Sequence, residues 1–108
     1  MVKVKHSTLD AVNVVKTYIT ELEKNGFHIK TAILFGSYAK GNFGEWSDID
    51  IALVSDDFEG NRFDDKDKIR KITLKVDSDI SPLPYKVEDF DESDLFVKEI
   101  LEAGIRIV

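Results

Sequence analysis

Residues 34–54, LFGSYAKGNFGEWSDIDIALV, carry the most informative pattern of the sequence. The stretch begins at the end of an apolar run, contains a glycine-serine turn at Gly36 and Ser37, and near its end Asp48 and Asp50 alternate with isoleucines. Residues two apart on a strand share a face, so the two aspartates are predicted to project together while Ile49 and Ile51 face the other side. Adjacent carboxylates repel each other unless a cation neutralises them, and oxygen ligands favour magnesium or manganese. The pattern indicates a metal clamp; a solvated strand face is the alternative.

The turn FGSYAKG supplies a second half of a site. Ser37 can open a short helix whose free backbone N–H groups suit a phosphate. Gly36 allows close backbone approach, and the Ser37 hydroxyl can bond a phosphate oxygen. A Gly-Ser pair alone is most often an ordinary turn. Beside a carboxylate pair on the next strand, it predicts a site for a metal-bound nucleoside triphosphate.

Hydrophobic spacing on either side of this stretch predicts alternating helices and strands. The first expected element is a helix that begins with a capping box at Ser7 and Asp10 and stops at Asn25 and Gly26, and strands over 27–35 and 49–54 follow it. A second helix carries Ile69, Ile72 and Val76, and a short strand near 77–81 is ended by Pro82 and Pro84. The chain then forms a helix from Ser93 to Gly104 and a terminal strand over 105–108. This order is typical of an α/β fold.

Composition limits the possible partners. The 108 residues are 43% hydrophobic, which predicts one globular domain over residues 1–108. Because the sequence shows neither a long apolar run nor a secretion signal, we expect no membrane association and a cytoplasmic location. With no cysteine, a metal must be held by oxygen or histidine. A net charge of -6 disfavours a nucleic-acid polymer as substrate but not a nucleotide that arrives with magnesium.

The segment GSYAKGNFGEWSDID carries a specific resemblance. It is similar to the Gly-Ser, ten residues, Asp-x-Asp signature of the DNA polymerase β-like nucleotidyltransferase superfamily, and the short chain resembles its minimal nucleotidyltransferase branch. The blocks SDIDIALV and FVKEILEAGIRIV agree, so the likeness spans most of residues 27–108. The resemblance implies a mixed sheet of about four strands flanked by helices, with Gly36 and Ser37 on the triphosphate of ATP and Asp48 and Asp50 binding Mg²⁺ or Mn²⁺.

The resemblance also implies a third carboxylate on a neighbouring strand, and here the sequence KVDSDISPLP departs from the usual pattern. By parity Asp77, Asp79 and Ser81 would share one strand face. Asp79 is our first choice as catalytic and metal-binding acid, and Asp77 is the second. If Ser81 itself takes the carboxylate position, the set of three acids is incomplete.

Two aromatic residues near the turn, Phe43 and Trp46, can either stack on a base or cover the site as packing. Lys40 can touch a phosphate, although an exposed loop lysine is the more common situation. These positions add no independent signal.

Three functions fit the resemblance. The first is a protein adenylyltransferase, an antitoxin that transfers AMP from ATP to a tyrosine of a HEPN-type toxin; the small size favours this hypothesis, because little chain remains to enclose an acceptor. The second is a small-molecule enzyme similar to aminoglycoside nucleotidyltransferases, which carry an additional helical domain. The third is a noncatalytic nucleotide-binding subunit, for which Ser81 is the main argument.

Overall fold

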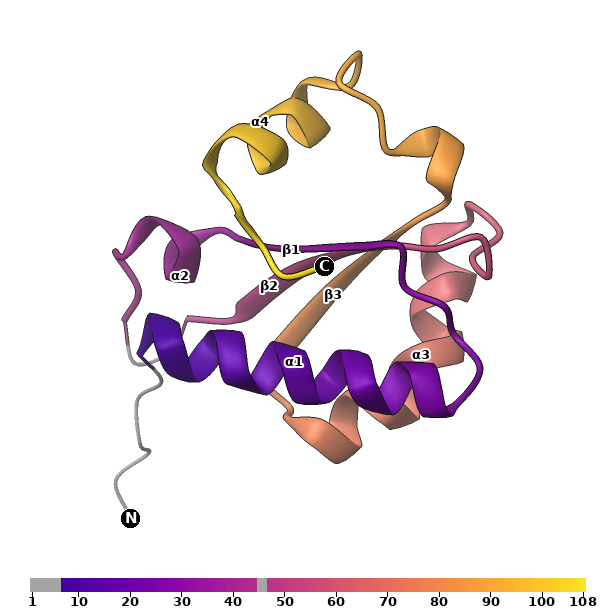
Figure 1. The fold of residues 1–108 in the computed structure, drawn as a ribbon, viewed down its shortest axis with the longest axis horizontal. Helices are drawn as coiled ribbons and strands as arrows, with labels where there is room; N and C mark the ends of the chain where they lie inside the picture. Colours follow the sequence, from indigo (N-terminus) through magenta and orange to yellow (C-terminus); the bar gives the residue numbers. More distant parts are fainter. Residues whose placement is uncertain (1–6, 45–46) are drawn as a thin grey trace.

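A computed structural model describes residues 7–44 and 47–108, and its elements alternate as the sequence predicts (Figure 1). They are α1 (Thr8–Lys24), β1 (Thr31–Phe35), α2 (Ser37–Lys40), β2 (Ile49–Val54), α3 (Arg62–Val76), β3 (Ile80–Tyr85), the 3₁₀ turn η1 (Val87–Asp89), α4 (Leu95–Ala103) and β4 (Ile105–Arg106). The strands form one sheet in the order β3-β2-β1-β4, in which only the β2–β3 pair is parallel. The predicted mixed sheet flanked by helices is therefore confirmed.

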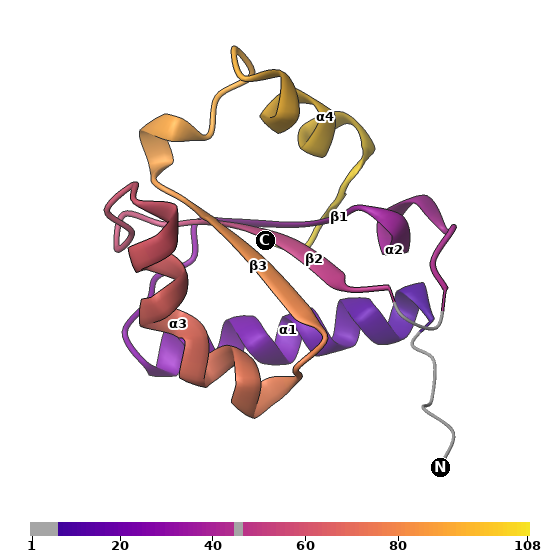
Figure 2. The same cartoon turned by 180° about the vertical axis from the view of Figure 1, so that it is seen from behind.

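Helices cover both faces of this sheet. Figures 1 and 2 show α1 and α3 on one side and α4 on the other. The odd-numbered β2 residues Ile49, Ile51 and Leu53 are fully buried among α1 and α3, whereas Ala52 and Val54 pack on the α4 side. This alternation separates the two faces of β2, and it puts Asp50 on the α4 side.

Local capping explains where the helices begin. Ser7 and Asp10 form the predicted capping box at the start of α1. The predicted cap of α4 is wrong by one residue: Asp94 accepts from the backbone N–H groups of Phe96 and Val97, while the Ser93 hydroxyl donates to Asp91. A carboxylate accepts two N–H groups at once, and its charge also favours a helix start.

The strand β3 corrects the prediction that Pro82 and Pro84 end a strand near 77–81. It begins at Ile80 and runs through both prolines to Tyr85. The reason is its position at the sheet edge. The carbonyls of Asp79 and Tyr85 accept from the N–H groups of Ile49 and Ser55, so the alternate residues, including both prolines, direct their backbone outward where no ladder donor is needed.

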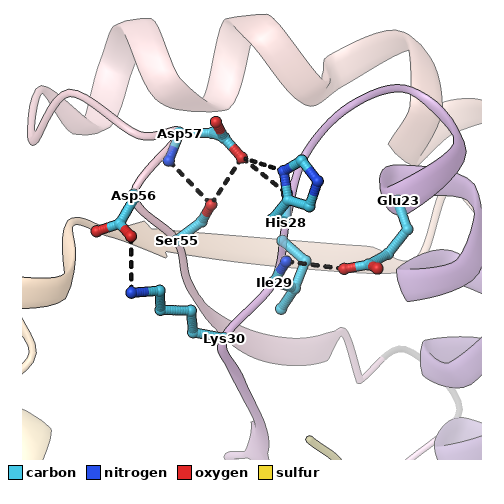
Figure 3. A network of polar contacts seen from close by, with 7 residues as sticks. All are labelled: Glu23, His28, Ile29, Lys30, Ser55, Asp56 and Asp57. Atoms are coloured by element: carbon cyan, nitrogen blue, oxygen red, sulfur yellow. Dashed lines mark hydrogen bonds and ion pairs between the residues drawn. The ribbon is translucent and has the colours of Figure 1, made fainter.

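A network of carboxylates joins the two strand ends farthest from the glycine-serine turn (Figure 3). The Asp57 carboxylate accepts from the backbone N–H of His28 at 2.8 Å, and Asp56 pairs with Lys30 at 2.7 Å. The backbone N–H of Ile29 likewise donates to a carboxylate of α1. Because residues 28–29 use their N–H groups in this way, β1 starts at Thr31 rather than at Phe27 as predicted.

No helix in the described ranges, 7–44 and 47–108, has both the length and the apolar character that a membrane span requires.

Candidate active site

The aspartate pair lies where β2 begins. Asp50 is opposite Phe35 in the β1–β2 register and is half-buried, and Asp48 is exposed just before the strand. Burial, and then the charge of Asp48, raise the pKa of the Asp50 carboxyl above its ordinary value. Burial and a neighbouring negative charge both disfavour the ionised carboxylate, and a bound cation would remove this penalty.

The glycine-serine turn lies directly against this pair. The backbone of Gly36 has φ 73° and ψ -152°, a conformation that residues other than glycine rarely adopt. A Cβ at this position would overlap Oδ2 of Asp50. Glycine is thus required here for two separate reasons. The predicted phosphate turn is therefore in contact with Asp50, one of the two predicted metal ligands.

The predicted short helix after Gly36 is present as α2, with Ser37 as its first residue and Gly41 ending it in the left-handed region. The Gly36 carbonyl accepts from the Lys40 N–H at 3.1 Å, and the Thr8 hydroxyl of α1 donates to the Tyr38 carbonyl at 2.9 Å. These bonds hold the turn in place, and the first N–H groups of such a turn have no acceptor within the helix.

Aromatic packing fixes the outer side of the turn. The rings of Tyr38 and Phe43 stack with centroids 4.6 Å apart and planes 14° apart, and Tyr38 is buried. Of the two interpretations of Phe43, this contact supports packing. Trp46 lies outside the described residues.

The third acid is where the structure and the sequence prediction differ. Asp77 and Asp79 do not lie on a strand: Asp77 caps the C-terminus of α3, and its carboxylate accepts from the N–H of Asp79 in the turn before β3. The β3 residue in register with Asp50 is Ser81. The parity argument failed because the strand begins one residue after Asp79.

The possible metal ligands of the described residues lead to the same conclusion about the third acid. In residues 7–44 and 47–108, no group of three or more His, Asp or Glu side chains is placed to hold a metal ion. Asp48 and Asp50 provide two carboxylates, and Mg²⁺ is commonly bound by one or two carboxylates together with substrate phosphates. These two carboxylates fit one divalent ion that arrives with a nucleotide. Among the described residues no comparable set of ligands is available for a second ion.

Helix α4 contributes two neighbours of the turn that the sequence analysis did not identify. Phe96 packs edge-on against Phe35 at 5.8 Å, and Glu99 pairs with Lys40 at 3.5 Å. Together with Gly36 they line a cavity of about 160 Å³. No local pattern of the sequence links Phe96 to Phe35 or residue 99 to residue 40.

Comparison with known proteins gives a consistent result. A family model described as a nucleotidyltransferase domain matches residues 15–107. "Putative protein adenylyltransferase MJ0141" of Methanocaldococcus jannaschii is 43% identical over 79 residues, which are 69% of this chain and 75% of the relative. "Putative protein adenylyltransferase MJ0604" of the same organism is 49% identical over 47 residues, covering 42% of this chain and 47% of the relative.

Two solved structures share the fold. A crystal structure of a "putative nucleotidyltransferase" from Sulfolobus solfataricus has a TM-score of 0.63 and 16% identity, covering 95% of this chain and 87% of that one. A second, described as "the toxin-antitoxin with AMP-PNP", has a TM-score of 0.57 and 24% identity, covering 90% and 72%. At these identities the likeness concerns the fold alone.

Proposed function

Because this chain belongs to the nucleotidyltransferase domain family, we propose that it transfers AMP from ATP to a hydroxyl group of a partner protein. The observation that carries the proposal is the contact between the Gly36 turn and the Asp50 carboxylate. This contact puts the turn that would bind the phosphate oxygens next to the carboxylate that would bind the accompanying cation. Mg²⁺, or Mn²⁺, would be held by Asp48 and Asp50 and would neutralise the charge of the phosphates.

The reaction is a displacement at the α-phosphorus. An acceptor hydroxyl oxygen forms the new O–P bond, the bond to the pyrophosphate leaving group breaks, and the hydroxyl proton is lost. Gly36 and Ser37 hold the terminal phosphates in line, and the benefit is the motional freedom removed before reaction. We assign the proton to Asp79: its carbonyl accepts from the N–H of Ile49 at 2.8 Å, so its backbone adjoins the start of β2, between the two site aspartates.

The acceptor is proposed to be a tyrosine of a HEPN-type toxin. Two curated relatives carry the name protein adenylyltransferase, and a structure of similar fold is a toxin-antitoxin complex that contains an ATP analogue. These statements concern those proteins, and they support the same acceptor class for this chain. A partner protein would also supply the acceptor surface that a sheet with few covering helices lacks.

The Ser81 register favours one competing function, a nucleotide-binding subunit without transferase activity. Without a carboxylate beside Asp50 on β3, the chain would bind a metal-nucleotide but activate the acceptor poorly.

The test is co-expression with the product of the adjacent gene, followed by intact-mass spectrometry. We expect mass increments of one AMP on the neighbour with the wild type and none with Asp48→Asn. An unmodified neighbour, with radiolabelled AMP passing to an aminoglycoside instead, would refute the protein acceptor. Binding of ATP and Mg²⁺ without any transfer would establish the noncatalytic function.

A further inference from the structure

A groove of about 340 Å³ lies between α3 and the edge strand β3, outside the site described above. Figure 2 shows α3 running beside β3 along this side of the molecule. The groove is lined by Phe63, Lys66, Asp67, Arg70, Thr73, Leu74, Ile80, Ser81 and Pro82.

The edge of β3 is closed to strand addition. Its outward-facing backbone includes Pro82 and Pro84, which have no N–H to offer an added strand. An occupant of the groove must therefore be recognised through side chains rather than by extending the sheet. This condition favours a helix or a compact segment over an extended strand.

The side chains of the groove combine exposed apolar surface with free positive charge. Phe63 is 84% exposed and Leu74 is 56% exposed, and together they put apolar surface at one groove. Within the described residues no ion pair engages Lys66, Arg70 or the one acid of the groove, Asp67, so the groove carries a net positive charge, whereas Lys68 and Lys75 of α3 are paired. In a chain of net charge -6, two unpaired cations beside exposed apolar side chains fit an occupant that is apolar and acidic.

The groove borders the strand that neighbours the candidate active site. Ser81 lines one part of the groove and lies in register with Asp50 on β2. Asp50 lies on the α4 side of the sheet, so a segment seated between α3 and β3 comes near the aspartates by passing over the β3 edge at Ser81. The same protein surface that fills the groove can present a hydroxyl group to the site.

We propose that the α3–β3 groove docks the acceptor protein through an amphipathic helical segment that carries leucine-type and acidic side chains. The inference rests on the proposed function for the identity of the occupant as the acceptor. Phe63 and Leu74 receive the apolar side chains, and Lys66 and Arg70 pair with the acids. Docking here sets which protein is modified, while the Gly36 turn and the aspartates bind the nucleotide.

Two synthetic helical peptides test the groove directly. Both have the same leucine spacing and one tyrosine, but one carries glutamate and the other lysine at the polar positions. Fluorescence anisotropy measures their binding to the full chain. We expect the glutamate peptide to bind at least about tenfold more tightly, and Phe63→Ser and Arg70→Gln each to weaken it about five- to tenfold.

Matched controls separate docking from general effects. Leu95→Ser removes another strongly exposed apolar side chain, on α4, and Lys71→Gln removes a neighbouring α3 charge that does not line the groove. Both should leave peptide binding unchanged. Because Phe63 and Arg70 are exposed, the variants should keep the wild-type melting temperature, which circular dichroism verifies.

Several results would overturn the proposal: no binding of either peptide, equal binding of both, or equal weakening by the controls. A concentration-dependent dimer that Phe63→Ser dissociates would assign the groove to a second copy of the chain instead. Failure of the proposed function shows separately, as the absence of a thermal shift with ATP and Mg²⁺. Peptide binding without that shift would leave a docking surface with no nucleotidyl transfer attached to it.

Discussion

The carboxyl groups at the two ends of the β1–β2 pair have pKa values shifted in opposite directions. At one end Asp57 accepts hydrogen bonds from His28, above all from its backbone N–H, and these lower the pKa of the carboxyl (Figure 3). At the other end burial and the neighbouring Asp48 raise the pKa of Asp50. The first end satisfies its charges within the chain. At the second end burial and a like charge act in the opposite direction, as they often do on carboxyl groups at functional sites.

The largest expected effect comes from Gly36→Ala. The substitution places a Cβ on Asp50 Oδ2 in a backbone conformation reserved for glycine, at a cost of about 1–3 kcal/mol of strain alone. We expect a lower free energy of unfolding and no thermal shift with ATP and Mg²⁺. Gly44→Ala is the control, because a Cβ there meets no atom within 4 Å. A Gly36→Ala protein that still responds to ATP would separate the turn from the nucleotide.

The aspartate pair gives the next effect. Mg²⁺ should raise the melting temperature and ATP should raise it further, by an amount equivalent to about 2.7 kcal/mol when the ligand is at 100 times its Kd. The double variant Asp48→Asn and Asp50→Asn should lose this response. Asp57→Asn, at the satisfied end, is the matched control. If the double variant responds as the wild type does, the ion binds elsewhere and the contrast between the two ends loses its functional meaning.

The position of Ser81 allows the charge imbalance to be increased. Ser81→Asp places a third carboxylate in register with Asp50. Without metal, the added repulsion should lower the melting temperature; with Mg²⁺, the thermal shift should exceed that of the wild type. Ser81→Asn is the uncharged control. An Asp variant with no larger metal response would show that this β3 position does not face the ion.

Asp79→Asn is expected to change turnover rather than binding. If Asp79 receives the acceptor's proton, the variant should lower the transfer rate well before it changes the affinity for ATP. Asp77→Asn should be milder, because an asparagine oxygen can still accept from the Asp79 N–H. The reverse order would move the role to Asp77, and no loss from either would favour the noncatalytic function.

Strong local patterns made most of the fold predictable. The alternation around Asp50 and the glycine-serine turn were sufficient to place β2 and α2, because burial dictates a period of two and glycine dictates the turn. The limits of β3 were not predictable in the same way. Whether a strand tolerates Pro82 depends on its being at a sheet edge, and neighbouring strands are chosen by tertiary contacts rather than by local sequence.

The site was predictable to the same extent as the strands that carry it. Asp48 and Asp50 share one strand beginning, so their proximity follows from local geometry. The partner on β3 depends on register, and a shift of two residues would put Asp79 opposite Asp50 in place of Ser81. The contact between Lys40 and Glu99 joins segments far apart in sequence, and exposed charged residues carry no signal of their partner.

The smallest effect concerns pH and separates the two ends by sign. The lowered pKa of Asp57 contributes stability above the ordinary value of 3.8 that is lost as the pH falls through the lowered pKa of the folded state. The raised pKa of Asp50 does the opposite: its contribution is present below 3.8 and is lost as the pH rises through the raised folded-state pKa. Melting temperatures of Asp57→Asn and the wild type should therefore converge in acid, whereas Asp50→Asn should gain on the wild type toward neutral pH. His28→Ala, which keeps the backbone donor, should retain much of the Asp57 behaviour. If the melting temperatures of the two asparagine variants, relative to the wild type, changed with pH in the same direction, the pKa values of the two aspartates would not be shifted in opposite directions.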